Sequence, residues 1–292
     1  MTIKHIVLSA ASYKVLYMIG AINLLNEQKY YKIEEIKSIH GTSAGCLFGL
    51  ALCLKLDWKN FLDYIINRPW DKDFNFTVTK VIEGIEKKGM LNIQHFYSIF
   101  STPFKQKGLK VDISLKELYE YSKIELYTYA VNLTTFKVEQ FSYKTHPDLK
   151  AIEAIYMSCC LPFVYQPMKY KDHYYVDGGL EIDYPINQCI ELTDNIEEIL
   201  GVKVIDDEIT HDLFTIEESD NIFTYGYYLF YKLLMNNKKR NYLKIENEIT
   251  IPCKTMNGDD AHKIINNSDE RKNIINEGKK IGYLYLKFKN LL

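Results

Sequence analysis

The sequence predicts an α/β fold, in which helices flank a central and mostly parallel β-sheet. Strand-like and helix-like segments alternate over residues 3–56, and a long stretch of helical character follows at 57–122. The 292 residues are 47% hydrophobic and contain no linker-like segment, so one large core is expected. We therefore predict a single domain with a helical insertion, in which residues 1–210 form the α/β part and residues 211–292 a helical C-terminal part packed on it.

The first elements alternate between strand and helix. Residues 3–8 form a short β-prone apolar run, and apolar side chains follow at helical spacing from Leu16 to Leu25. A second β-prone run at 33–39 leads into an apolar helix at about 44–56. Strands and helices in such close succession favour a right-handed crossover between parallel strands.

The remaining elements are predicted from composition and periodicity. Residues 57–122 look mostly helical and carry spaced aromatic side chains, which indicates a helical insertion or cap. β-Prone runs predict strands at 124–131, 137–143 and 199–204 and a hairpin at 168–176. Helical spacing predicts helices at 153–160, 223–235 and 270–288.

The charge balance argues against nucleic acid as a partner. Lys and Arg number 36 against 38 Asp and Glu, so no global positive field exists. A solvated helix end explains the densest basic run, Lys238-Lys239-Arg240, although contact with lipid head groups stays open. Polar residues interrupt the apolar segment 6–25, and 222–235 is too short to span a bilayer. With neither signal peptide nor transmembrane segment evident, we expect a cytoplasmic protein.

The cysteines show no metal-binding pattern. They form no C-x-x-C pair, and no histidine stands at zinc-site spacing from them. Most are flanked by apolar residues, which is typical of buried, reduced thiols in a reducing compartment. The sequence therefore predicts no metal site at the cysteines, which are residues 46, 53, 159, 160, 189 and 253.

A G-x-S-x-G pentapeptide, Gly41-Thr42-Ser43-Ala44-Gly45, lies between a predicted strand and a predicted helix. In a nucleophile elbow the serine sits in a sharp, strained turn, and glycine two residues away on each side avoids a clash. The start of the following helix also offers free N–H groups and a positive dipole end to a developing oxyanion. An ordinary glycine-flanked turn is the alternative interpretation.

A second motif, Val176-Asp177-Gly178-Gly179, places a carboxylate at the end of a predicted strand. In isolation it is typical of a simple Asp-Gly turn. Together with the serine motif it acquires a chemical meaning, because a serine hydroxyl becomes a strong nucleophile only when a positioned base removes its proton.

These two motifs, in this order, resemble those of the patatin-like phospholipases, in which the elbow reads G-x-S-x-G and the base lies in D-G-[GA]. The resemblance covers about residues 3–205, is weak over 57–122, and implies that residues 1–210 are a patatin-like catalytic domain. Its further matches are Ile6-Val7-Leu8-Ser9, Ile19-Gly20, Ser158, Leu161-Pro162, Pro167 and Pro185.

The resemblance implies that Ser43 is the acyl-accepting nucleophile and Asp177 its general base, with no histidine required. The implied activity is phospholipase A-like hydrolysis of acyl esters, with phospholipids or other lipid esters as substrates. Serine, aspartate and backbone amides can supply nucleophile, base and charge stabilisation, so we expect neither metal nor cofactor. The glycines that would shape the elbow and the base motif are Gly41, Gly45, Gly178 and Gly179.

The loop after the first strand departs from the family pattern. The family reads G-G-G-x-[KR]-G there and uses the loop's N–H groups as the oxyanion hole, whereas this chain reads Ala10-Ala11-Ser12-Tyr13-Lys14-Val15. Lys14 keeps the basic position, but all four glycines are replaced. A position that needs positive φ costs a non-glycine residue roughly 1–2 kcal/mol, and a misaimed donor costs about 10²–10³ in turnover. A catalytically attenuated relative that binds lipid or a protein partner is therefore the alternative.

Three further interpretations concern single elements. A Ser-His-Asp triad is the nearest enzymatic rival, but nothing marks the candidate histidines, 146, 173, 211 and 262, as catalytic. Asp183 replaces the asparagine usual in the family and is expected to be a solvated loop carboxylate. The aromatic helix at 223–235 is apolar on nearly all sides, which favours a core helix over peripheral membrane contact.

Overall fold

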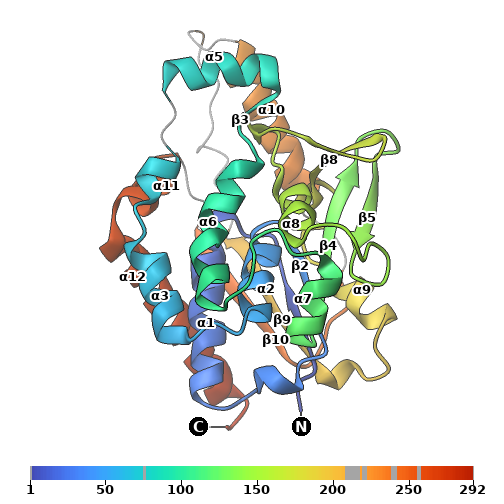
Figure 1. The fold of residues 1–292 in the computed structure, drawn as a ribbon. Coiled ribbons are helices and arrows are strands. Elements are labelled where there is room, and N and C mark those ends of the chain that lie inside the picture. The colour runs from blue at the N-terminus through green and yellow to red at the C-terminus, as the bar shows by residue number, and fades with distance from the viewer. Residues whose placement is uncertain are drawn as a thin grey trace.

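The predicted α/β architecture is present in a computed structural model, which describes residues 2–74, 77–207, 218, 222–237, 242–254 and 258–291 (Figure 1). The main sheet has the strand order β10-β9-β1-β2-β4-β8-β7, with β5 paired to β4. Strands β10, β9, β1, β2 and β4 run parallel, and the β4–β5, β4–β8 and β8–β7 pairs are antiparallel. The strands are β1 (His5–Leu8), β2 (Ser38–Thr42), β4 (Glu125–Asn132), β5 (Lys137–Phe141), β7 (Met168–Tyr170), β8 (His173–Asp177), β9 (Ile199–Asp207) and β10 (Glu248–Lys254).

Helices cover the sheet and form the insertion predicted at 57–122. Two short strands in that region and beyond it, β3 (Gly89–Leu91) and β6 (Phe163–Tyr165), form a separate parallel pair. The helices are α1 (Val15–Glu27), α2 (Ala44–Cys53), α3 (Trp58–Asn67), α4 (Trp70–Asp73), α5 (Val78–Lys87), α6 (Ile93–Gln106), α7 (Leu115–Ser122), α8 (Ala151–Cys159), α9 (Ile186–Glu191), α10 (Ile222–Asn237), α11 (Gly258–Asn266) and α12 (Ser268–Phe288).

The core divides between the two faces of the sheet because successive strand residues point to opposite sides. In β1, Ile6 and Leu8 belong to the large cluster, whereas Val7 lies in a smaller cluster with Tyr184 and Ile199. All three β1 side chains are completely buried. The first strand is therefore interior on both faces, as its uninterrupted apolar run predicts.

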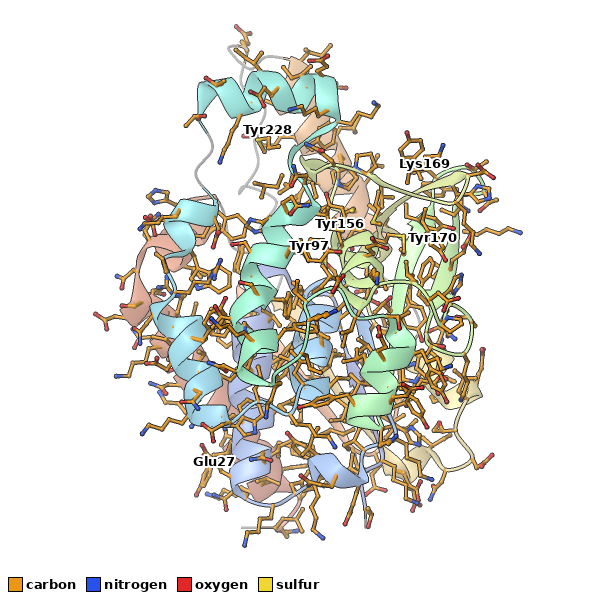
Figure 2. All side chains as sticks on the ribbon, in the orientation of Figure 1. Glu27, Tyr97, Tyr156, Lys169, Tyr170 and Tyr228 are labelled. Carbon is orange, nitrogen blue, oxygen red and sulfur yellow. The ribbon has the colours of Figure 1, made fainter. Side chains whose placement is uncertain are left out.

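Tyr156 connects the insertion to the main sheet. It projects from α8 into the interior, toward the part of the insertion that contains Tyr97 (Figure 2). Its hydroxyl donates to the carbonyl oxygens of Gln166 at 2.8 Å and Leu91 at 3.3 Å. Gln166 follows β6 and Leu91 ends β3, so one buried phenol fastens both short strands to α8.

Helix α12 is fixed against the opening helix by close backbone approach. A Cβ atom at Gly20 of α1 would lie 2.0 Å from the carbonyl oxygen of Ile275, and one at Gly278 would lie 2.1 Å from that of Tyr17. Real Cβ atoms do not approach so closely, and only glycine permits these contacts. Helices α1 and α12 therefore pack directly on one another.

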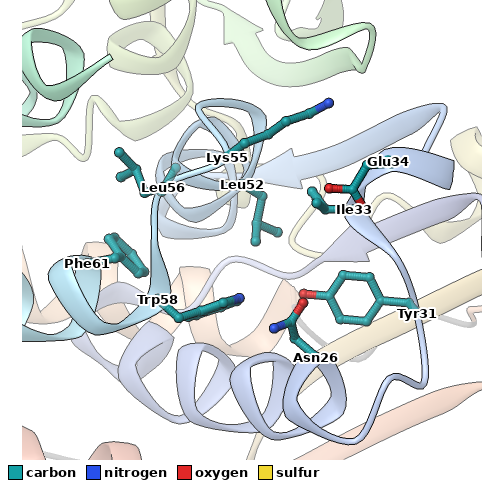
Figure 3. A pocket seen from close by; sticks show the side chains of 10 residues that line it. Asn26, Tyr31, Ile33, Glu34, Leu52, Lys55, Leu56, Trp58 and Phe61 are labelled. Atoms are coloured by element: carbon teal, nitrogen blue, oxygen red, sulfur yellow. The ribbon is translucent and has the colours of Figure 1, made fainter.

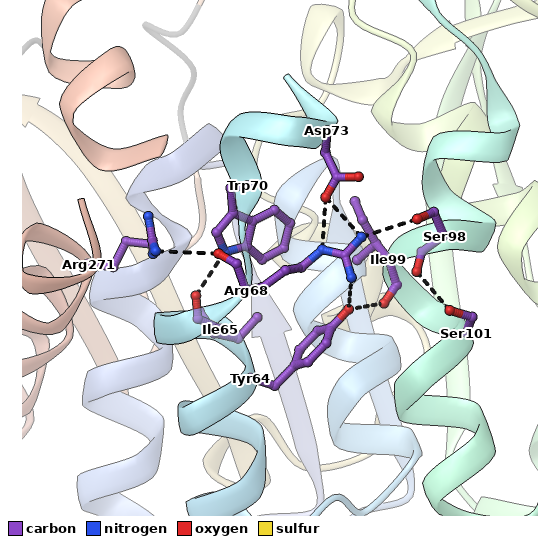
Figure 4. A network of polar contacts seen from close by, with 9 residues as sticks. All are labelled: Tyr64, Ile65, Arg68, Trp70, Asp73, Ser98, Ile99, Ser101 and Arg271. Atoms are coloured by element: carbon purple, nitrogen blue, oxygen red, sulfur yellow. Dashed lines mark hydrogen bonds and ion pairs between the residues drawn. The ribbon is translucent and has the colours of Figure 1, made fainter. Parts of the chain in front are cut away.

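Two arginines join α12 and the insertion (Figure 4). Arg68 follows α3, forms an ion pair with Asp73 at 2.8 Å and donates to the Tyr64 hydroxyl at 2.6 Å. Arg271 of α12 is buried and donates to the carbonyl oxygens of Ile66 and Ile264 at the C-terminal ends of α3 and α11. A cation at such ends satisfies carbonyl groups that the helix leaves unpaired.

Two secondary-structure predictions differ from the structure. The run 33–39 is a strand only from Ser38, because residues 33–35 form a 3₁₀ turn. The part after residue 210 is not wholly helical, since it contains β10, which is an edge strand of the main sheet and pairs with β9. Residues Ile249, Ile251 and Cys253 alternate inward along β10, a period-two signal that the sequence analysis missed. Residue 210 lies outside the described residues, so the division there stays a prediction.

Cysteine burial agrees with the sequence, and no spanning helix is found. All six cysteines are free and buried. Among the helices in the described ranges, none is both long and apolar enough to cross a membrane. The run 238–240 lies outside the described residues.

Candidate functional site

Strand register brings Ser43 and Asp177 together across one intervening strand. Thr42 of β2 pairs with Tyr129 of β4, and Asp177 of β8 pairs with the next β4 residue, Ala130. Ser43 directly follows Thr42, so it reaches the level of Asp177. The Ser43 hydroxyl donates to Asp177 Oδ2 at 2.7 Å.

The carboxylate of Asp177 is held in place by its own motif. Its Oδ1 accepts from the N–H of Gly179 at 2.7 Å, while Oδ2 faces Ser43. Its side chain is only 4% exposed. A Cβ atom at Gly178 would lie 2.2 Å from the Tyr129 carbonyl oxygen, which explains why the turn begins with glycine.

The backbone of Ser43 has the strained geometry expected of an elbow. Its φ is 52° and its ψ is −127°, in a region that L-residues rarely occupy. A Cβ atom at Gly41 would lie 2.6 Å from the N atom of Cys46, and one at Gly45 would lie 2.5 Å from the carbonyl oxygens of Leu8 and Ser9. The glycines therefore leave room for the tight turn and for the end of β1.

The glycine-free loop after β1 lies against both motifs. It contacts the elbow where Ser9 approaches Gly45, and Ala10 lies next to Gly179. The N–H of Ala10 donates to the carbonyl oxygen of Asp183 at 2.6 Å and is thus engaged. Asp183 itself is not the solvated carboxylate we expected, because the Tyr242 hydroxyl donates to its Oδ1.

Two amides of this loop make no hydrogen bond to a described residue. Within the described part of the chain, the N–H groups of Ala11 and Ser12 have no hydrogen-bond acceptor. Ser12 has a φ of 48°, so the conformation that glycine favours is required at this replaced position. Lys14 is buried, and its N–H donates to the carbonyl oxygen of Ala11 at 3.0 Å. The loop therefore keeps donors but carries backbone strain at Ser12.

The last turn of α8 contacts both halves of the pair. The Ser158 hydroxyl accepts the N–H of Ser43 at 3.0 Å, and the carbonyl oxygen of Cys160 accepts the N–H of Asp177 at 3.0 Å. From the sequence, Ser158 is recognised only as a match to the family pattern. Its proximity to Ser43 could not be read from a separation of 115 residues.

The neighbouring thiols are not competing nucleophiles. Burial raises the pKa of both Cys159 and Cys160 well above the usual value, and the charge of Asp177 raises it further. The Sγ atoms of Cys46 and Cys159 lie 3.8 Å apart as free thiols. A cysteine acts as a nucleophile through its thiolate, so the raised pKa values of Cys159 and Cys160 disfavour their reaction near neutral pH.

The described histidines form contacts away from Ser43. His146 bonds to Thr145 and His173 to Thr134 through their Nδ1 atoms. His262 is exposed on α11, and His211 lies outside the described residues. In the ranges that the structure describes, no group of three or more His, Cys, Asp or Glu side chains is placed to hold a metal ion.

Comparison with known proteins identifies the family of this chain. A family model for the patatin-like phospholipases matches residues 6–190. The chain belongs to the patatin-like phospholipase family. The resemblance drawn from the two motifs is therefore confirmed.

Two viral proteins are similar to this chain. "Probable lipid hydrolase 463L" of Invertebrate iridescent virus 6 is 26% identical over 190 residues, which are 64% of this chain and 63% of the relative. An uncharacterized protein of Acanthamoeba polyphaga mimivirus is 22% identical over 200 residues, 68% of this chain and 65% of its own. The match thus spans somewhat less than two thirds of each relative.

The fold also occurs in a solved bacterial structure. VipD from Legionella pneumophila aligns with 99% of this patatin-like chain and 67% of its own, with a TM-score of 0.53 at 14% identity. At this identity the likeness concerns the fold alone. It confirms the prediction of a mostly parallel sheet with flanking helices.

A separate pocket of about 230 Å³ lies at the far end of α2 (Figure 3). Leu52, Lys55 and Leu56 line it near the C-terminal end of that helix, whereas Ser43 stands at the N-terminal end. Nine residues of helix between Ser43 and Leu52 correspond to roughly 14 Å. This pocket therefore does not adjoin Ser43.

Proposed function

We propose that this patatin-like chain is a lipolytic serine acyl hydrolase that uses Ser43 as nucleophile and Asp177 as general base. The observation that carries the proposal is the 2.7 Å hydrogen bond from the Ser43 hydroxyl to Asp177 Oδ2 at the end of a strained elbow. Base and nucleophile within hydrogen-bond reach are the minimum that serine acyl transfer requires. The name of the viral relative supports lipid esters as the substrate class.

The arrangement supports the following steps. Ser43 Oγ attacks the ester carbonyl carbon while its proton moves to Asp177 Oδ2. When the tetrahedral intermediate collapses, the carbon–oxygen bond to the alcohol breaks and the proton passes to that alcohol. Asp177 then takes a proton from water, whose oxygen attacks the acyl-enzyme, and the proton returns to Ser43 as the fatty acid leaves. The hydrogen bond from Gly179 to Oδ1 keeps the carboxylate oriented throughout.

Oxyanion stabilisation is assigned to the loop after β1. The N–H groups of Ala11 and Ser12 are free within the described residues, and the loop adjoins both the elbow and the base motif. Backbone donors aimed at the developing charge are the usual means of stabilising it. Phospholipids or related acyl esters are the substrates that we propose.

A fluorophosphonate probe, which phosphonylates activated serines, tests this function. We expect labelling of the wild type, none of Ser43→Ala, and labelling of Asp177→Asn slower by about 10²–10⁴. The matched control is Ser122→Ala, which removes a buried serine hydroxyl bonded to Ile124 and should label normally. Labelling that does not depend on Ser43 would exclude the proposed nucleophile.

A catalytically attenuated lipid-binding protein is the second candidate. Two observations favour it, namely the positive φ of Ser12 and the engagement of the Ala10 amide by Asp183. If the folded wild type is not labelled but retains lipid, this second function replaces the first.

Peripheral contact with a lipid surface is part of the proposal. We expected helix α10 to be a core helix, but one of its faces is exposed. That face carries Ile222, Tyr225, Leu229 and Leu233. The helix packs on the turn that follows Asp177.

A second exposed apolar face lies nearby on α5, at the same end of the molecule as α10 (Figure 1). It consists of Val81, Ile82 and Ile85. Apolar helix faces beside a lipolytic site suit insertion into a bilayer surface.

Flotation with phosphatidylcholine vesicles tests this contact. The double variant Leu229→Ser/Leu233→Ser should float less than the wild type. The control is Leu284→Ser, because Leu284 is also exposed but lies on α12. Equal flotation of all three proteins would remove α10 from the proposal.

A further inference from the structure

The end of α8 binds the backbone of both proposed catalytic residues within three successive positions. Ser158 Oγ accepts the N–H of Ser43, and the carbonyl oxygen of Cys160 accepts the N–H of Asp177, each at 3.0 Å. Ser158 is completely buried. One short segment therefore contacts the nucleophile and the base from the protein interior.

We infer that Ser158 is a positioning residue for the dyad, and this inference rests on the proposed function. Backbone conformations such as that of Ser43 persist only when the surroundings fix them. The hydrogen bond that Ser158 Oγ accepts fixes the Ser43 N–H and thereby aims the Ser43 side chain at Asp177. Because the Ser43 N–H is already bonded to Ser158, other amides must stabilise the oxyanion.

A second contact shows why α8 is a firm support. The Cys46 thiol, in the first turn of α2, contacts the carbonyl oxygen of Ile155 and the Cys159 thiol, each at 3.8 Å. Helices α2 and α8 are thus held together beside the elbow. Because Cys160 remains bonded to Asp177, removal of the Ser158 hydroxyl releases the nucleophile while the base stays in place.

A purely structural role for Ser158 makes a different prediction from a positioning role. In the structural case, its loss lowers stability and leaves the catalytic constants of the folded protein unchanged. In the positioning case, the nucleophile moves relative to its base, and a displacement of about 1 Å can cost about 10²-fold in rate. The separation of kcat from stability therefore distinguishes the two.

The experiment compares wild type, Ser158→Ala, Ser158→Thr and the control Ser122→Ala with a soluble p-nitrophenyl ester. We expect Ser158→Ala to lower kcat by about 10–100-fold with KM unchanged. Ser158→Thr keeps the acceptor oxygen and should recover most of kcat. A kcat for Ser158→Ala no lower than that of Ser122→Ala overturns the inference.

A structural readout keeps the inference testable apart from the activity. Turnover by the wild type but not by Ser43→Ala establishes the function independently of Ser158. If the wild type is inactive, the crystal structure of Ser158→Ala tests whether Ser158 positions Ser43. Separation of Ser43 Oγ and Asp177 Oδ2 beyond about 3.5 Å supports positioning, and an unchanged hydrogen bond overturns it.

Discussion

The imidazole of His40 stacks on the phenol ring of Tyr127, with ring centroids 4.3 Å apart and planes inclined by 12°. Its Nδ1 also lies 2.8 Å from the hydroxyl of Tyr129. His40 belongs to β2, three residues before Ser43, and is fully buried. Burial lowers the pKa of His40 to about 3 because a charged imidazolium would lose its hydration.

Stability should therefore fall as the pH drops below about 6.5. Between pH 6.5 and 3 the unfolded chain binds a proton at His40 that the folded chain does not, so protonation favours unfolding. The slope is at most about 1.4 kcal/mol per pH unit for one such group. His95 adds to it, since burial lowers the pKa of His95 to about 4. Urea denaturation at pH 7.0, 6.0 and 5.0 measures the slope.

The variant His40→Gln should reduce the slope of stability against pH by the contribution of one histidine, even if its stability at pH 7 is lower. The matched change His262→Gln alters an exposed histidine of α11 and should leave the slope as it is. A wild-type slope that His40→Gln does not reduce would contradict the assignment.

Removal of the Arg271 guanidinium should destabilise the junction of α3, α11 and α12. Its Nε and Nη2 donate to the Ile66 carbonyl oxygen at 2.9 and 2.6 Å, and Nη1 donates to those of Ile264 and Ile265. We expect Arg271→Met to lower the free energy of unfolding by roughly 2–4 kcal/mol, because several buried acceptors lose their donor. Lys272→Met, at the exposed neighbouring position, should change it by less than about 0.5 kcal/mol. Equal losses in the two variants would argue against the capping role.

A methyl group at Gly45 should disrupt the elbow. The added Cβ atom would meet backbone oxygens of Leu8 and Ser9 at 2.5 Å, so α2 must shift. We expect Gly45→Ala to lower stability by about 1–3 kcal/mol and turnover by about 10²-fold. At Gly49 on the same helix, the nearest atoms to an added Cβ belong to side chains, those of Ile39 and Leu126 at 3.0 and 3.1 Å, so Gly49→Ala should be tolerated better. Ester turnover and thermal unfolding of both variants test the difference.

Restoration of glycine at position 12 should relieve strain. Ser12→Gly removes a penalty of roughly 1–2 kcal/mol for the positive φ of this residue. It also favours unfolding by roughly 0.5–1 kcal/mol, because glycine has more conformational entropy in the unfolded chain. A net stabilisation of about 0.5–1 kcal/mol is therefore expected in chemical denaturation. Lys88→Gly, at another left-handed position far from the loop, should stabilise similarly. If only Lys88→Gly stabilises, the strain assigned to Ser12 is absent.

The sequence predicts the sheet order only in part. The strand and helix before Ser43 follow from local periodicity, since each element is contiguous and apolar. The position of Asp177 beside Ser43 depends on the pairing of β2 with β4 and of β4 with β8. No local pattern encodes that register. In the sequence, only the joint presence of the two motifs indicated that Ser43 and Asp177 lie close together.

Other features depend on contacts between distant segments. Ser158 lies 115 residues from Ser43, and Asp183 meets Tyr242 across 59 residues. The strand β10 was missed because its alternating side chains stand within a region of mostly helical character. Such residues are recognised only when the tertiary structure shows what they contact.

The glycine contacts between α1 and α12 have a consequence for synthesis. A ribosome completes residues 15–27 early but reaches residues 268–288 only at the end of the described chain. Until then, the face of α1 that meets α12 has no partner. A nascent chain halted before residues 268–288 would therefore expose an apolar face of α1 suited to chaperone binding.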